Sequence, residues 1–384
     1  MNQKEPEQLQ TEMAKSLRKA VPLFLMAIMV LAFLSFQPVA SFAQVSGADK
    51  PIAGTTPGGT DNAANSSAEM WRKIRRGVQA TTTGQNKMSG QLMQSEGNDW
   101  RLTRTGPMLM YSSWAILGII MLLCLFFALR GRIRVEGGLA GKTIKRFSTI
   151  ERLAHWLLAS SFICLALTGL NLMFGRTVLM PLLGKDAFSS ITIAGKFIHN
   201  YVAFAFIAAL VMILILWFVH NIPNRHDVMW FLKGGGIFGS GHPAARKFNA
   251  GQKVLFWIII LCGASISLSG WALMNPFTLS MFGGTFELVN QIFGTTYQAD
   301  LSLIQEQQYQ SIWHALMAIF LIVVVIAHIY IGTLGMEGAI SAMTSGDVDI
   351  KWAREHHSLW VEEVEASENT TGKKGDGEAL QPAE

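Results

Sequence analysis

The sequence predicts an all-α membrane protein, in which a signal-peptide-like segment and one extra transmembrane helix precede a four-helix transmembrane bundle. Half of the 384 residues are hydrophobic and only 15% are charged, against about 25% charged in a typical soluble domain. Long uncharged runs cause this imbalance, and all but the first can cross a bilayer core of about 30 Å as helices. No run alternates as a membrane-spanning strand would. The runs are Val21–Phe36, Met108–Leu129, Leu153–Phe174, Ile198–Val219, Val254–Met274 and Ile312–Leu334.

Residues 1–43 have the features of a secretory signal peptide. Basic residues precede the apolar run, and the small residues of "SFA", Ser41–Ala43, follow it. This order predicts cleavage after Ala43, and an uncleaved anchor is the alternative. Residues 44–107 are rich in Gly, Ser, Thr, Asn and Gln. We expect them to form a flexible periplasmic segment with a short helix near "AEMWRKIRRGVQA".

Charge in the loops orients the remaining helices. Basic residues crowd the end of the extra helix, residues 108–129, and the loop 220–253, whereas the loop 275–311 has no Lys or Arg. The positive-inside rule therefore places the first two in the cytoplasm and the third outside. We expect the bundle to span residues 145–335 and a cytoplasmic C-terminal tail with a disordered end to span 336–384. This topology is that of a multi-pass protein of the bacterial inner membrane.

Two histidines lie in one apolar helix, "SIWHALMAIFLIVVVIAHIYIGT". Fourteen residues separate His314 from His328, which is about 21 Å along a helix and within about 40° of the same face. His155 begins a helix that starts inside, and His199 begins a helix that starts outside. The depths therefore predict an outer pair of His199 with His314 and an inner pair of His155 with His328.

Paired imidazoles on facing membrane helices suit the two axial positions of a haem iron. No CxxCH motif is present, so we expect two non-covalent haems of the b type. Zinc or copper would not explain two separated pairs of imidazoles. A lone membrane histidine can also simply bond a neighbour, and His220 competes with His155 for the inner site. His226, His242, His356 and His357 lie in polar stretches, where we expect solvent.

Several segments carry a family resemblance. "RFSTIERLAHW", "FIHNYVA", "FVHNIPNRHDVMWF", "RKFNAGQKVLFW", the two-histidine helix and "IKWAREHHSLWVEE" resemble the gamma subunit of respiratory membrane-bound formate dehydrogenase, a di-haem cytochrome b. The resemblance covers about residues 145 to 365. The histidine spacing is shared with the cytochrome b of nickel–iron hydrogenases, whereas "HNIPNRHD" and "NAGQK" are more specific to formate dehydrogenase.

The resemblance implies functional residues. The haem ligands would be His155, His199, His314 and His328. The quinone site would comprise Asn249, Gly251, Gln252 and Lys253. From the residues alone, Asn249 could equally cap the helix that starts near Val254. Basic residues such as Arg146 would either neutralise haem propionates or simply follow the positive-inside rule.

The resemblance also implies partners and a role. An iron–sulfur beta subunit would deliver electrons from a catalytic alpha subunit that carries molybdenum or tungsten on a pterin. Electrons would cross the two b haems to menaquinone or ubiquinone, with proton uptake from the cytoplasm. This chain would be a non-catalytic subunit without a formate-oxidising site. A hydrogenase cytochrome b, a proton-relay transporter without haem and a structural anchor are the alternatives.

Overall fold

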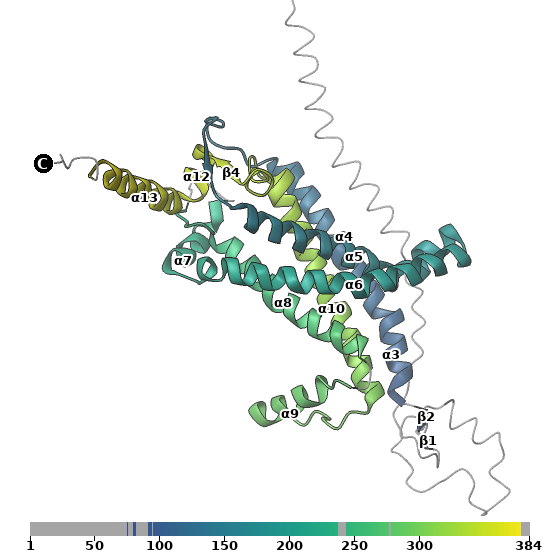
Figure 1. Cartoon of the computed structure of the whole chain (residues 1–384). Coiled ribbons are helices and arrows are strands. Elements are labelled where there is room, and N and C mark those ends of the chain that lie inside the picture. The colour runs from purple at the N-terminus through teal and green to yellow at the C-terminus, as the bar shows by residue number, and fades with distance from the viewer. Residues whose placement is uncertain are drawn as a thin grey trace, which may run out of the picture.

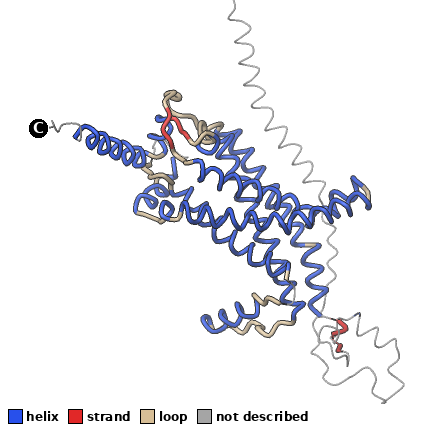
Figure 2. Tube along the Cα trace, viewed as in Figure 1, coloured by secondary structure: helices blue, strands red, loops and turns tan. Residues whose placement is uncertain are grey.

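A computed structural model describes residues 95–236, 243–275 and 278–377, together with Arg75 and the short strands β1 (Ala80–Thr81) and β2 (Gln91–Met93). Helices dominate these ranges (Figures 1 and 2). Within them, five helices are long and apolar enough to cross a membrane. They are α4 (Pro107–Arg130), α5 (Thr149–Leu183), α6 (Lys185–Trp217), α8 (Ala250–Met274) and α10 (Leu303–Tyr330). The expected signal segment, residues 1–43, lies outside the described residues.

The long helices contact one another in an order that brings the histidines together. Helix α5 packs along α6, α6 contacts α8, and α8 packs on α10, which also contacts α5. Helix α4 lies against α10 from outside this group, and Phe126 and Phe127 meet the ring of Tyr330 edge-on at 6.3 and 6.4 Å. The extra helix is thus present one residue longer at each end than expected.

Capping boxes fix where three of these helices begin. In each box, the side chain of the cap residue accepts a hydrogen bond from the backbone N–H three residues on, and the side chain of that third residue accepts from the backbone N–H of the cap residue. The pairs are Ser148 with Glu151, Asn249 with Gln252, and Ser302 with Gln305. Such reciprocal bonds satisfy two backbone donors that the first helical turn leaves free. Between α5 and α6 the chain turns at Gly184, whose φ of 80° favours glycine.

Shorter elements flank the membrane-length helices. Helix α3 (Ser95–Thr105) precedes α4, so the last part of the segment expected to be flexible is helical. Its Trp100 donates a hydrogen bond to Ser311, eight residues after the first residue of α10 (3.1 Å). Helix α9 (Phe282–Phe293) lies between α8 and α10, and α7 (Arg225–Leu232) lies between α6 and α8.

A folded unit, which we call the cap, covers one end of the bundle. It comprises residues 131–148, 243–249 and 336–366. Strand β3 (Thr143–Lys145) pairs antiparallel with β4 (Asp347–Asp349), and Ile144 faces Val348 across the pair. Helices α11 (Ser341–Thr344), α12 (Ile350–His356) and α13 (Ser358–Gly377) complete it. Residues 336–366, expected to be part of a tail, are therefore folded.

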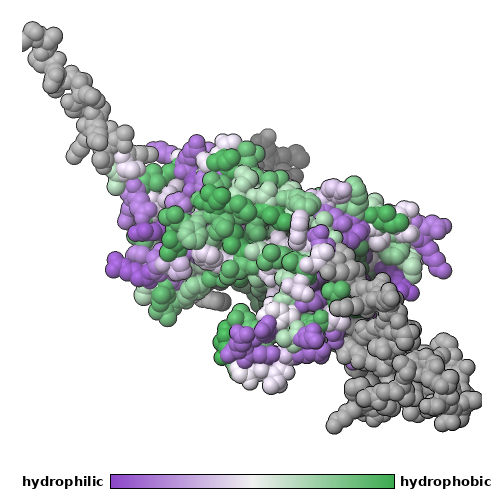
Figure 3. All heavy atoms as spheres, turned by 60° about the horizontal axis from the view of Figure 1, so that its bottom comes forward, coloured by the Kyte–Doolittle hydropathy of each residue, from purple (hydrophilic) through white to green (hydrophobic). Residues whose placement is uncertain are grey.

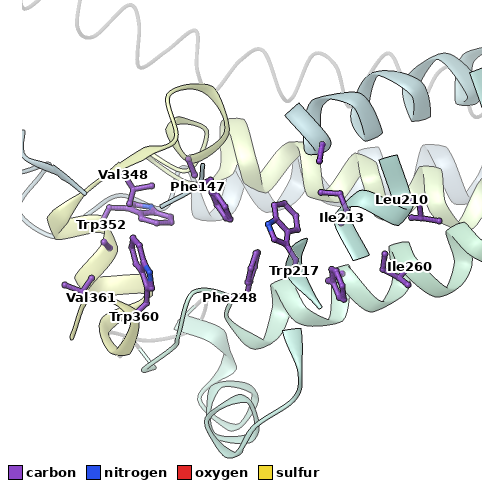
Figure 4. Close-up of a cluster of buried hydrophobic side chains, with 14 of the residues drawn as sticks. Phe147, Leu210, Ile213, Trp217, Phe248, Ile260, Val348, Trp352, Trp360 and Val361 are labelled. Atoms are coloured by element: carbon purple, nitrogen blue, oxygen red, sulfur yellow. The ribbon is translucent and has the colours of Figure 1, made fainter. Parts of the chain in front are cut away.

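The main hydrophobic core runs from the cap into the bundle (Figure 4). Val348, Trp352 and Trp360 contribute from the C-terminal part, and Trp217 and Ile213 from the end of α6. Elsewhere the long helices expose many large apolar side chains. Figure 3 shows hydrophobic residues over the middle of the visible face and hydrophilic residues toward its ends, as a lipid-facing surface requires.

Candidate functional site: two histidine pairs

The structure brings the four membrane-depth histidines together in the two predicted pairs. The rings of His155 (α5) and His328 (α10) have centroids 6.2 Å apart with planes at 65°. The rings of His199 (α6) and His314 (α10) are also 6.2 Å apart, with planes at 64°. We call them the cap-side pair and the far-side pair, since the first lies near the cap and the second toward the other end of the helices.

The ring separation fits a shared metal between two imidazoles. An iron–imidazole bond of about 2 Å, with the ring centroid about 1 Å beyond the nitrogen, puts coaxial ligands about 6 Å apart. Both pairs have this separation. Directly hydrogen-bonded imidazoles would lie closer, since their nitrogens would be about 3 Å apart. The residues present therefore fit a bis-imidazole haem at each pair.

Hydroxyl groups hold the far-side imidazoles. Thr168 Oγ1 lies 2.8 Å from His199 Nδ1, and Ser269 Oγ lies 3.0 Å from His314 Nδ1. Each hydroxyl also donates to a carbonyl of its own helix, Thr168 to Cys164 (2.8 Å) and Ser269 to Ile266 (3.0 Å). With its one proton on the carbonyl, each hydroxyl oxygen accepts from the imidazole Nδ1–H. This tautomer leaves both Nε2 lone pairs free to bind a metal.

A glycine follows each of these hydroxyl residues and contacts the same imidazole. A Cβ at Gly169 would lie 3.4 Å from His199 Cε1, and a Cβ at Gly270 would lie 3.1 Å from His314 Cε1. The two tripeptides are "LTG" in α5 and "LSG" in α8. Thr168 and Ser269 each lie nineteen residues after the first residue of their helix, so the two hydroxyl–glycine pairs, Thr168–Gly169 and Ser269–Gly270, lie at matching depth.

The cap-side pair has different surroundings. The His155 ring lies near the rings of Trp156 (5.5 Å) and Trp217 (6.5 Å). Its Nδ1 is buried and has no hydrogen-bond partner among the described residues. His220, the competitor of His155, is exposed in the 3₁₀ turn η1 (Val219–Asn221), and its ring centroid is 6.5 Å from that of Phe248. The ring that pairs with His328 is that of His155.

An aromatic path leads from the cap-side pair to the predicted quinone residues. The ring centroids of Trp217 and Phe248 are 5.2 Å apart, and Phe248 immediately precedes Asn249 in the chain. Asn249 caps α8, because its Oδ1 accepts from Gln252 N (2.9 Å) while Gln252 Oε1 accepts from Asn249 N (3.1 Å). These bonds use the amide oxygens, so the amide N–H groups can still donate.

Packing accounts for the other two residues of that motif. Lys253 is 4% exposed, and its Nζ donates to Asp227 (2.8 Å) and to the carbonyl of Ile222 (3.0 Å). A Cβ at Gly251 would lie 3.0 Å from the Trp230 ring. Both residues thus hold α7 close to the start of α8.

The expectation that His357 is solvated is wrong, because its side chain is fully buried in the cap. Arg146 Nη2 donates to His357 Nε2 (2.9 Å) and to the carbonyl of Lys247 (2.7 Å), and His357 Nδ1 donates to Arg246 O (2.7 Å). Burial lowers the pKa of Arg146 to about 9. Burial first, and then the nearby charge of Arg146, hold the pKa of His357 well below its usual value. His357 is therefore neutral, and Arg146 lies over the rings of Phe147 and Trp352 (5.1 and 5.2 Å).

The apolar helices and the family match define a multi-pass membrane protein of the cytochrome b class. The chain belongs to the prokaryotic cytochrome b561 family, whose model matches residues 146–346. This match covers α5 to α10 and the smaller part of the cap, and it leaves α4 outside.

Curated relatives are cytochrome subunits of one enzyme. The chain is 28% identical to the cytochrome b556(fdo) subunit of formate dehydrogenase from Escherichia coli K12, over 61% of this chain and 98% of the relative. It is 27% identical to the nitrate-inducible cytochrome b556(Fdn) subunit of the same organism, over 59% and 94%. The subunit from Haemophilus influenzae is 25% identical, over 57% and 83%. The resemblance to this subunit is thereby confirmed.

Sequence reasoning missed Thr168 and Ser269. The available signal was the pair of tripeptides "LTG" and "LSG", which lie at the same distance from the start of two helices that begin on the cap side.

Proposed function

We propose that this chain is the membrane-anchoring, electron-transfer subunit of a formate dehydrogenase complex. It would pass electrons from an iron–sulfur partner through two b haems to a membrane quinone, menaquinone or ubiquinone. The observation that carries the proposal is the pair of matched histidine sites, each with a ring separation of 6.2 Å, on helices of membrane length. The names of the curated relatives support formate as the electron source of the complex.

We assign the four histidines as axial ligands: His199 and His314 for one haem, His155 and His328 for the other. When bound, each haem would supply a one-electron iron couple, and holding each iron by two histidines would favour electron transfer over oxygen binding. The far-side hydroxyls fix the imidazole tautomers and ring orientations. Carrying one ligand of each pair on α10 keeps the two sites about 21 Å apart along the axis.

We propose that the quinone binds beside the cap-side pair, at Asn249, Gly251, Gln252 and Lys253. The free amide N–H groups of Asn249 and Gln252 can donate to a quinone carbonyl as it gains charge. Gly251 and Lys253 support this site by packing, through Trp230 and Asp227. The aromatic contacts from His155 through Trp217 to Phe248 end next to these amides, which supports the location.

We propose that the cap lies in the bacterial cytoplasm and that α3 and α9 lie on the periplasmic side. The basic residues of the cap segments and the lack of Lys or Arg in residues 275–311 support this orientation. Protons for quinone reduction would then enter from the cytoplasm, while the iron–sulfur subunit and a molybdenum or tungsten–pterin catalytic subunit would bind outside. Formate oxidation would take place in that catalytic subunit.

The deciding experiment is haem quantification with a redox difference spectrum of the purified full-length chain. We expect two non-covalent, low-spin haems per chain. His199→Ala and His155→Ala should each remove one haem, while His220→Ala, the matched control, should retain both. A folded protein without haem would refute the proposal and favour a proton-relay transporter, because a proton relay has no visible chromophore.

A second experiment separates quinone binding from helix capping at Asn249. Serine retains a capping oxygen, whereas alanine removes it at a cost of about 1 kcal/mol. If the amide also binds quinone, Asn249→Ser and Asn249→Ala should both slow quinone reduction by the intact complex about tenfold, the effect of losing about 1.4 kcal/mol. Only the alanine variant should lose stability. Normal quinone reduction in Asn249→Ser would leave the residue with a capping role alone.

A further inference from the structure

The two histidine pairs differ in what their imidazole Nδ1 atoms meet. Both far-side imidazoles donate to a hydroxyl that is itself anchored to its helix, Thr168 for His199 and Ser269 for His314. On the cap side, the buried Nδ1 of His155 has no partner among the described residues. The same kind of ligand therefore stands in two electronic environments.

This difference acts on a bound metal. An imidazole that donates from Nδ1 gains electron density at Nε2 and becomes a more basic ligand. A more basic ligand stabilises the ferric state more than the ferrous state, and so lowers the reduction potential of the haem. The Thr168 and Ser269 hydroxyls lie within reach of backbone carbonyls, those of Cys164 and Ile266, and donating their protons there leaves the oxygens to accept from the imidazoles.

The repetition of the arrangement argues against chance packing. Thr168 and Ser269 come from different helices, at equal distances from the helix starts. Each is followed by a glycine against which the imidazole Cε1 lies, so ring position and acceptor position are set together. Ser269 is fully buried, where an unbonded hydroxyl would be costly.

We infer that Thr168 and Ser269 are positioning residues that lower the potential of the far-side haem, so that electrons pass downhill from the far-side pair to the cap-side pair. The inference rests on the proposed function, since it concerns haems at both pairs. In this inference the two hydroxyls, on α5 and α8, set which of the two haems has the lower reduction potential. It also explains why a hydroxyl–glycine pair lies beside each of the two far-side histidines.

The test is a spectroelectrochemical redox titration of the purified full-length chain with its haems. The far-side haem is identified as the signal that His199→Ala removes. In Thr168→Val and in Ser269→Ala, which lose the acceptor, the reduced-to-oxidised ratio of that haem at fixed potential should rise about tenfold, which is about 59 mV for one electron. The cap-side haem should not change.

Two variants serve as controls. Ser267→Ala removes a hydroxyl two residues away on α8 that donates only to the carbonyl of Gly263 (2.7 Å), and it should leave both potentials unchanged. Thr168→Ser restores an acceptor and should restore the native potential. If Thr168→Val loses the haem, the potentials of Thr168→Ser and Ser269→Ala test the inference instead.

Two haems per chain with unchanged potentials in both acceptor variants would overturn the inference and leave the proposed function standing. A shift of the cap-side haem instead would overturn it as well. A wild-type chain without haem would overturn the proposed function itself, so the two failures are distinguishable.

Discussion

The glycines beside the far-side pair allow a comparison within one protein. An alanine Cβ at Gly270 would lie 3.1 Å from His314 Cε1, whereas one at Gly169 would lie 3.4 Å from His199 Cε1. The second distance is an ordinary contact and the first is shorter by about 0.3 Å, so Gly270→Ala must displace the His314 ring. Alanine in a helix interior otherwise stabilises by about 0.5–1 kcal/mol relative to glycine.

We therefore expect opposite outcomes from one and the same chemical change. Gly169→Ala should keep two haems with native low-spin spectra. Gly270→Ala should shift the far-side low-spin signal or lower far-side haem occupancy, because a displaced ring misaligns a metal bond of about 2 Å. The assay is electron paramagnetic resonance with haem quantification. Gly118→Ala on α4 is the control, since a Cβ there meets nothing within 4 Å. Equal spectra for all three variants would refute the steric reasoning.

Two further predictions concern the cap end. The pKa of His357 is held well below its usual value of 6.5, so below about pH 6.5 the unfolded cap binds a proton that the folded cap does not. The free energy of unfolding of the cap should therefore fall by about 1.4 kcal/mol for each pH unit below about 6.5. Hydrogen exchange of the β4 amides measures this, and an exchange free energy that does not change with pH would contradict it. Lys253→Met removes the ammonium that pairs with the partly buried Asp227, which keeps only its bond from Asn224 N–H, and should cost about 1–3 kcal/mol. A lower thermal midpoint measures this loss. Lys253→Met with Asp227→Leu should recover part of it, and no loss in the single variant would show that the pair is not structural.

Local rules explain why the histidine pairs were predictable. Helix rise and charge bias place His155, His199, His314 and His328 at definite depths from the sequence alone. Histidines on facing helices can pair only if they lie at the same depth, which leaves one possible partner for each of the four. The side-chain acceptor of Asn249 at the start of α8 was likewise predictable from capping rules.

Features that depend on distant segments escaped prediction. His357 and its neighbour His356 look alike in a polar stretch, yet only contacts with Arg146 and Arg246 bury His357. The pairing of β3 with β4 joins segments about two hundred residues apart, and three-residue strands carry almost no periodic signal. Residues 336–366 were for that reason expected to be part of a tail.

Helix α10 links the two histidine pairs to the other long helices. This helix carries one histidine of each pair, and it packs on α4, α5 and α8, whereas α4 and α5 expose Leu122 and Leu167. Trp100 and Ser311 join its far-side end to α3, and Phe126 and Phe127 cover Tyr330 near its cap-side end. Both histidines of α10 are thus held by a helix that is supported at its two ends by segments outside the family match. A displacement of α10 would move both sites together, so the separation between them depends on helix rise and not on interhelical packing.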